Sequence, residues 1–133
     1  IFGIGQTGTY AGVITKFMKN LASKKPPVIY GDGKQVRDFV YVEEAVDANL
    51  VAMKSDVHSG FFNIGTGIAT SVNSLANLMI SLYGYSFKPI YTKPLKGDIK
   101  MSQADTNLTE KLLGWKFKTK LKEGLLKIIP KEI

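Results

Sequence analysis

Residues 28–42 read Val-Ile-Tyr-Gly-Asp-Gly-Lys-Gln-Val-Arg-Asp-Phe-Val-Tyr-Val and carry the most ordered pattern of the chain. The apolar run 28–30 predicts a strand, and residues 31–34 predict a turn because glycine adopts the backbone angles that tight turns need. Residues 36–42 predict a second strand. The stretch therefore predicts a strand, a glycine turn and a strand, in the manner of a hairpin.

Helical patterns lie on both sides of this stretch. The apolar residues from Tyr10 to Leu21 recur at helical spacing, and Pro26-Pro27 must end that helix. Downstream, helices are expected over residues 43–53, after a Ser71 cap, after an Asp105 cap and over residues 121–129, and short strands over residues 61–64 and 87–91. Strands and helices alternate, which predicts an α/β fold.

Length and composition limit the classes of protein to which this chain can belong. The chain has 133 residues, is 44% hydrophobic and 22% charged, and has no cysteine and one histidine, His58. This size predicts one domain or part of one. The composition excludes disulfides, thiol nucleophiles and paired-histidine zinc sites. No run is long enough to cross a bilayer and no signal peptide is recognisable, so we expect a soluble, cytoplasmic protein.

Arg37 is the most informative single residue. The net charge is +7, yet Arg37 is the only arginine among 18 basic residues. The scattered lysines are typical of a solvated surface, whereas a guanidinium suits bidentate capture of phosphate. The other interpretation is a structural ion pair of Arg37 with Asp38 or Glu43.

Two short motifs match well-known functional patterns, but the secondary structure that each pattern requires is not predicted around them. Residues 3–8 spell G-x-G-x-x-G, but only two residues precede them and the first acidic residue afterwards is Asp32. A dinucleotide fingerprint needs a strand before it and an acid about 20 residues after it. Tyr30 and Lys34 spell Y-x-x-x-K across a glycine turn, although that catalytic pair needs a helix. Neither motif predicts a site here.

The run 27–42, Pro followed by the residues quoted above, resembles a segment of the nucleotide-sugar epimerases and dehydratases, in the extended short-chain dehydrogenase/reductase family. Further similarities follow in order at residues 62–67 (Phe-Asn-Ile-Gly-Thr-Gly), 97–98 (Gly-Asp), 104–105 (Ala-Asp) and 113–115 (Leu-Gly-Trp). Residues 2–13 are similar to the loop and helix after the catalytic tyrosine of UDP-glucose 4-epimerases. The resemblance covers essentially the whole chain.

This resemblance implies an α/β substrate-binding lobe with the last strand and helix of a Rossmann-type sheet. We expect the C-terminal part of a longer protein, because the sequence begins at Ile1-Phe2-Gly3 without a methionine or a preceding strand. Residues 1–133 would form a single nucleotide-sugar binding lobe. An upstream domain would bind NAD and carry the catalytic residues, so this chain alone would have no catalytic, cofactor or metal residues and no activity.

The resemblance also implies roles for individual residues. Arg37 would hold the diphosphate of a UDP-sugar, and Val28 and Tyr30 would contact the base and ribose. Val13 would meet the phosphates or base beside a helix N-terminus, Asn63 would bind the nucleotide portion, and Asp98 would reach a ribose hydroxyl. Other interpretations stay open: Val13 and Val28 as core, Tyr30 as strand surface and Asn63 as a turn residue.

Departures from the family pattern leave the substrate open. Leu95 stands where relatives often have a second arginine, and Lys93 or Lys96 would supply a point charge instead; Ile4 replaces the usual proline of the opening loop. One alternative is a dTDP-glucose 4,6-dehydratase or another nucleotide-sugar enzyme. Another alternative is a basic nucleic-acid-binding or interaction module. The chain lacks the regular aromatic platform and the basic stripe that such a module would need.

We also expect an exposed apolar face and self-association, and no membrane partner.

Overall fold

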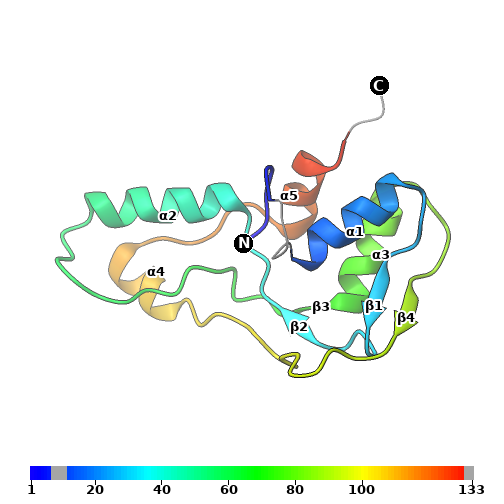
Figure 1. Ribbon diagram of the computed structural model, residues 1–133. Helices are drawn as coiled ribbons and strands as arrows, with labels where there is room; N and C mark the ends of the chain where they lie inside the picture. Colours follow the sequence, from blue (N-terminus) through cyan, green and yellow to red (C-terminus); the bar gives the residue numbers. More distant parts are fainter. Residues whose placement is uncertain (7–11, 131–133) are drawn as a thin grey trace.

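The computed structural model describes residues 1–6 and 12–130 and shows a mixed α/β arrangement (Figure 1). This confirms the α/β class. Most expected helices are present within one or two residues of their predicted bounds. In chain order the elements are α1 (Val13–Ala22), β1 (Val28–Tyr30), β2 (Val36–Arg37), α2 (Val42–Lys54), β3 (Thr70–Ser71), α3 (Val72–Leu82), β4 (Ile90–Thr92), α4 (Asn107–Leu113) and α5 (Leu121–Ile128).

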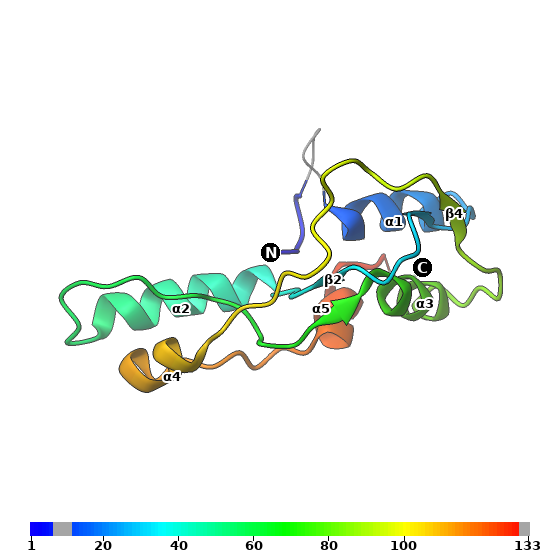
Figure 2. The same ribbon diagram turned by 90° about the horizontal axis from the view of Figure 1, so that it is seen from below.

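Two apolar clusters organise these elements. The larger cluster joins α1, β1, α3 and α5, which gather at one end of the molecule, and the smaller joins α2 to α4 at the other end (Figures 1 and 2). Helices α1, α3 and α5 bury apolar residues of the stripes that their periodicity predicts. The largest fully buried side chains of the larger cluster are Phe17, Leu21, Ile29, Leu75, Met79 and Leu125.

The predicted Ser71 cap of α3 is present, whereas the N-cap residue of α4 is Thr106, one residue after the predicted Asp105. The Ser71 hydroxyl accepts a hydrogen bond from the Ser74 N–H at 3.0 Å, as expected of an N-cap residue. The Asp105 carboxylate accepts from the Asn107 N–H at 3.0 Å at the start of α4. Hydrogen bonds at a helix start can be predicted from the sequence because they involve residues only a few positions apart.

The hairpin prediction for residues 28–42 is wrong. β1 pairs in parallel with β4, and β2 pairs antiparallel with β3. The glycines do turn the chain, with φ of 84° at Gly31 and 72° at Gly33. However, the turn is bound to α3: the Asn73 N–H donates to Gly33 O and its side-chain amide to Asp32 O, both at 2.9 Å. These bonds direct β2 away from β1.

The strand predicted over residues 61–64 is also absent. This segment lies beside α4, where Asn63 O accepts a hydrogen bond from the Thr109 hydroxyl at 2.7 Å. Among the described residues no strand lies alongside it, so its backbone forms no ladder. The strand predicted over residues 87–91 is present but shifted to 90–92, where it meets β1.

Asp38 ties three chain segments together. Its carboxylate accepts hydrogen bonds from the Thr66 N–H, the Thr66 hydroxyl, the Gly67 N–H and the Ala104 N–H. Gly65 lies so close that a Cβ there would be 2.6 Å from the Ala104 Cβ. A charged acceptor at this crossing satisfies donors that the loops leave unpaired.

The apolar stripe of α2 faces outward. Val46, Leu50 and Met53 are 55%, 45% and 79% exposed, whereas Glu44 and Ala48 are buried. The expected exposed apolar face is therefore present on this helix. None of the described helices is long and apolar enough to span a membrane.

Glu44 connects α2 to the segment before α5. Burial favours the neutral carboxyl, but hydrogen bonds from Thr119 favour the charged form and prevail, so the pKa of Glu44 is lowered. The Thr119 N–H donates to Oε1 at 2.6 Å. A buried carboxylate thereby links the two ends of the molecule.

Candidate functional site

A cavity of about 240 Å³ is lined by residues from five separate stretches of the chain. It lies between the first turns of α1, the strand β1, the strand β2, the start of α3 and the loop that follows β4. Five of the seven predicted site residues line it, namely Val13, Val28, Tyr30, Arg37 and Asp98. Two of these predicted residues, Val13 and Asp98, are 85 positions apart in sequence and meet at one place.

Arg37, the second residue of β2, is held at this cavity by three hydrogen bonds. Its Nη1 donates to Val36 O at 2.8 Å and to Ile99 O at 2.6 Å, and its Nη2 donates to Asp98 Oδ1 at 2.7 Å. The Arg37 and Asp98 side chains remain 27% and 30% exposed. Of the five N–H donors of a guanidinium, the Nε–H and one Nη2–H have no partner among the described residues.

The ion pair predicted as the alternative for Arg37 exists, but with a different partner. Arg37 pairs with Asp98, whereas Asp38 binds the loops described above and Glu43 pairs with Lys127 at 3.0 Å. The reason is that consecutive residues of an extended chain point to opposite sides. Asp38 therefore cannot share the side of β2 that Arg37 occupies.

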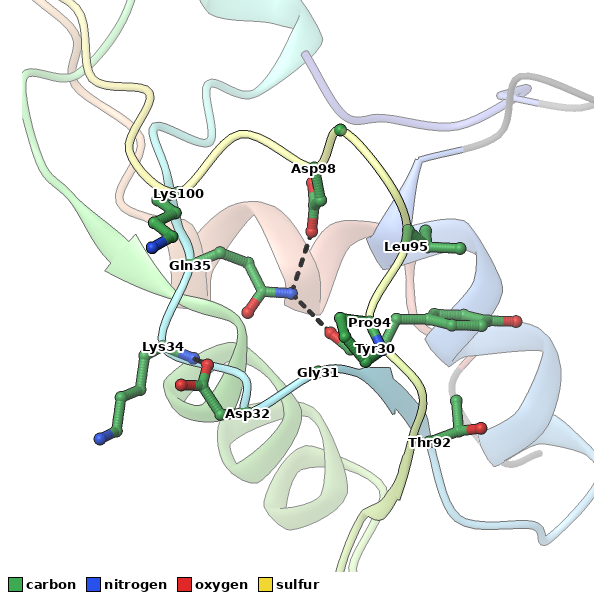
Figure 3. Close-up of a pocket in the computed structure, with 11 residues that line it drawn as sticks. Tyr30, Gly31, Asp32, Lys34, Gln35, Thr92, Pro94, Leu95, Asp98 and Lys100 are labelled. Carbon is green, nitrogen blue, oxygen red and sulfur yellow. Dashed lines mark hydrogen bonds between the residues drawn. The ribbon is translucent and has the colours of Figure 1, made fainter.

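Gln35 links the two sides of the cavity. Its side-chain amide donates to Tyr30 O at 3.0 Å and to Asp98 Oδ2 at 3.3 Å (Figure 3). Asp98 is thus held on one oxygen by Arg37 and on the other by Gln35. Each carboxylate oxygen retains lone pairs for a further donor such as a hydroxyl.

The apolar wall of the cavity comes from α1, β1 and the loop after β4. Val13 and Val28 are half-buried, and Tyr30 is 39% exposed. The Tyr30 ring extends past Leu95 toward α1 (Figure 3). Gly12, the N-cap residue of α1, has no side chain, and no described side chain caps the first turn of this helix, whose residues Gly12 and Val13 line the cavity.

A second, wider cavity of about 790 Å³ adjoins the first and shares Tyr30, Gln35, Leu95 and Asp98 with it (Figure 3). Its lining also includes Asp32 and Lys34 of the glycine turn. The Lys34 N–H donates to Asp32 Oδ1 at 2.9 Å within this turn. The Y-x-x-x-K pattern is therefore in a turn, as the glycines predict.

Asn63 and Lys96 lie outside the first cavity. The Asn63 amide donates to Asp105 O at 3.2 Å, beside α4. Lys96 is exposed on the loop after β4, where Leu95 rather than a lysine lines the cavity. The roles of these two residues at a nucleotide site stay predictions, and their placement gives them no support.

Three other lining residues, Lys16, Gln35 and Val72, have no role in the sequence analysis. A signal existed for Lys16, which is three residues after Val13 and therefore on the same helix face. Gln35 and Val72 had no comparable signal, because their positions depend on the turn that packs against α3.

The described residues do not fit a dinucleotide site. Phe2 forms a single bridge with Tyr41 rather than a strand leading into the glycines, and Asp32 lies in an exposed turn. Gly8, the last glycine of the motif, and Tyr10 of the first apolar stripe lie outside the described residues. Within the described part of the chain, no three His, Cys, Asp or Glu side chains are grouped as a metal site would need.

Comparisons with known proteins identify a family to which the chain is similar. A model of the NAD dependent epimerase/dehydratase family matches residues 1–65. A putative UDP-glucose 4-epimerase from Methanocaldococcus jannaschii is 40% identical over 121 residues, which are 90% of this chain and 38% of that protein. The chain thus spans well under half the length of this relative.

Solved structures show the same arrangement of elements. A UDP-glucose 4-epimerase from Thermotoga maritima, solved with UDP-glucose, is 40% identical with a TM-score of 0.89, covering 96% of this chain and 41% of that one. A UDP-N-acetylglucosamine 4-epimerase from Methanobrevibacter ruminantium, solved with UDP-N-acetylmuramic acid, is 34% identical with a TM-score of 0.89, covering 96% and 42%. Together with the motifs and the fold, these similarities show that the chain belongs to the NAD-dependent nucleotide-sugar epimerase/dehydratase family.

Proposed function

We propose that this chain is the nucleotide-sugar binding part of a UDP-glucose 4-epimerase-like enzyme. The observation that carries the proposal is the convergence of Val13, Val28, Tyr30, Arg37 and Asp98 on one cavity. These residues combine an apolar wall, a cation and a carboxylate, which are the groups that a nucleoside diphosphate requires. The sugar moiety would extend from the diphosphate toward the rest of the enzyme.

The diphosphate would bind to the free donors of Arg37. Its Nε–H and remaining Nη2–H are on neighbouring nitrogens, and a phosphate can accept hydrogen bonds from both. The bonds to Val36 O, Ile99 O and Asp98 fix the guanidinium before the ligand arrives. Such preorganisation reduces the entropy lost on binding. The first turn of α1, which no described side chain caps, would add backbone N–H groups to the same anion.

The nucleoside would occupy the apolar wall. Tyr30 and Val28 would contact the base and ribose, and Val13 would contact the base from α1. Asp98 would accept a hydrogen bond from a ribose hydroxyl through a lone pair that Arg37 and Gln35 leave free. The chain would contribute binding energy remote from the sugar, which positions the reacting carbon without contacting it.

In this proposal NAD is held by residues outside the chain, since the described residues do not fit it. The hydride chemistry at sugar C4 that NAD supplies in such an enzyme is therefore assigned to no residue here. We expect the 133-residue chain alone to have no epimerase activity. The departures at Ile4 and Leu95 leave a dTDP-sugar enzyme of the same family as the alternative.

Calorimetric titration with UDP-glucose, dTDP-glucose and GDP-mannose tests the proposal. Preferential binding of UDP-glucose is expected, and preference for dTDP-glucose would favour the alternative enzyme. Salt-sensitive retention of DNA without any response to UDP would instead favour a nucleic-acid-binding module. A Tyr30→Ala variant should weaken nucleotide binding, because it removes the proposed contact with the base and ribose. The variant should still fold, because the exposed Tyr30 ring contributes little to the core.

A further inference from the structure

The net charge of the proposed nucleotide cavity depends on one residue of α1. The acidic and basic side chains that line the cavity are Lys16, Arg37 and Asp98. Arg37 and Asp98 are in direct contact at 2.7 Å, so their opposite charges largely cancel at a distance. Lys16 therefore provides the one positive charge in the lining that no carboxylate balances.

The position of Lys16 suits this role. It follows Val13 by three residues and lies on the same face of α1, next to the N-terminal turn of the helix. Its side chain is exposed and forms no hydrogen bond and no ion pair with another described residue. Its ammonium group is therefore free to move toward a ligand on a flexible four-carbon chain.

The opposite wall offers no second cation. Leu95 lines the cavity there, and the neighbouring Lys93 and Lys96 do not. A diphosphate linked to a sugar carries two negative charges. Binding at an electrically balanced Arg37–Asp98 pair would leave both charges uncompensated, whereas Lys16 neutralises one of them.

We propose that Lys16 is a diphosphate-binding residue that supplies the net positive charge of the nucleotide cavity, while Arg37 supplies the directional hydrogen bonds. This inference rests on the proposed function. It separates two tasks that a second arginine could otherwise share: attraction by charge and orientation by geometry. Affinity should then depend on ionic strength through Lys16 and on donor geometry through Arg37.

A matched pair of variants tests this division. Lys16→Gln and Lys19→Gln each remove one exposed lysine charge from α1, but Lys19 does not line the cavity. Binding of UDP, UMP and uridine to the 133-residue chain is measured at about 0.1 M and about 1 M NaCl, between which the Debye length falls from roughly 10 Å to roughly 3 Å. Urea unfolding confirms that both variants fold.

Lys16→Gln is expected to weaken UDP binding about 5-fold at the lower salt concentration, with a smaller loss for UMP and none for uridine. Its UDP affinity should also depend less on salt than that of the unchanged chain. Lys19→Gln should bind UDP within about 2-fold of the unchanged chain, and Lys16→Arg should restore most of the affinity.

Equal UDP affinity in the two glutamine variants would overturn the role of Lys16 and leave the proposed function standing. An equal loss of UDP and uridine binding in Lys16→Gln would also overturn it, because the effect would then not involve the phosphates. Failure of the unchanged chain to bind UDP at either salt concentration would overturn both the proposed function and this inference.

Discussion

Replacing Arg37 by lysine separates charge from geometry at the proposed diphosphate site. Lysine keeps the positive charge but has one nitrogen instead of a planar fork. It can retain the contact with Asp98, but it cannot also reach Val36 O and Ile99 O and present two donors to a phosphate. Arg37→Lys therefore preserves the ion pair and removes the bidentate interaction.

The expected loss follows from these bonds. A hydrogen bond involving a charged group contributes about 1.5–3 kcal/mol, and the 27% exposure of the Arg37 side chain extends the expected range downward to about 1 kcal/mol. We expect Arg37→Lys to weaken UDP binding by about 1–3 kcal/mol, which is roughly a 5- to 150-fold loss of affinity. Uridine binding should change little, because it contains no phosphate.

Calorimetry with UDP and a chemical-shift titration with uridine measure the two affinities, and urea unfolding measures stability. Loss of the bonds to Val36 O and Ile99 O should also lower the free energy of unfolding by about 1 kcal/mol. If the folded variant bound UDP as tightly as the unchanged chain, Arg37 would have only its structural role as the partner of Asp98. The proposed phosphate contact would then be refuted.

Three further predictions concern stability and association. Glu44→Gln should lower the free energy of unfolding by about 1 kcal/mol at pH 7. Because the folded-state pKa of Glu44 lies below its ordinary value of 4.5, its stabilisation is complete above that pH and is lost as the pH falls through the folded-state pKa. Urea titrations should therefore show the variant and the unchanged chain converging in acid, and a constant difference would contradict the role of the charged form. Asp38→Asn turns an amide group toward N–H donors and should cost roughly 2–3 kcal/mol of unfolding free energy in urea melts, whereas an unchanged midpoint would show that the loops find other acceptors. We also expect self-association through the exposed stripe of α2. Sedimentation velocity should show a concentration-dependent shift that the double change Leu50→Gln and Met53→Gln reduces, and a monomer at all concentrations would exclude it.

The helices and their caps could be predicted from the sequence because their determinants are local. Ser71 and Asp105 bind N–H groups two or three residues away, and the stripe on α1 repeats within a single helix. The ordered motifs of residues 27–42 likewise indicated the family. Arg37 could be identified as a candidate phosphate-binding residue because it is the single arginine of the chain.

Strand pairing could not be predicted, because it depends on segments far apart in the chain. Residues 28–42 have the pattern of a hairpin, yet β1 pairs with residues 90–92 and β2 with residues 70–71. Hydrogen bonds from Asn73 to the glycine turn decide this. No local pattern shows that α3 will begin beside that turn.

The sequence by itself therefore determined the helical segments, the family motifs and the importance of Arg37. Only the tertiary structure decided that Asp98 rather than Asp38 pairs with Arg37, that Asn63 lies beside α4, and that Lys16 faces the cavity. The physical reason is that a helix satisfies its hydrogen bonds within a few residues, whereas the cavity is assembled from side chains whose distances are set by the packing of α1, α3 and the loop after β4.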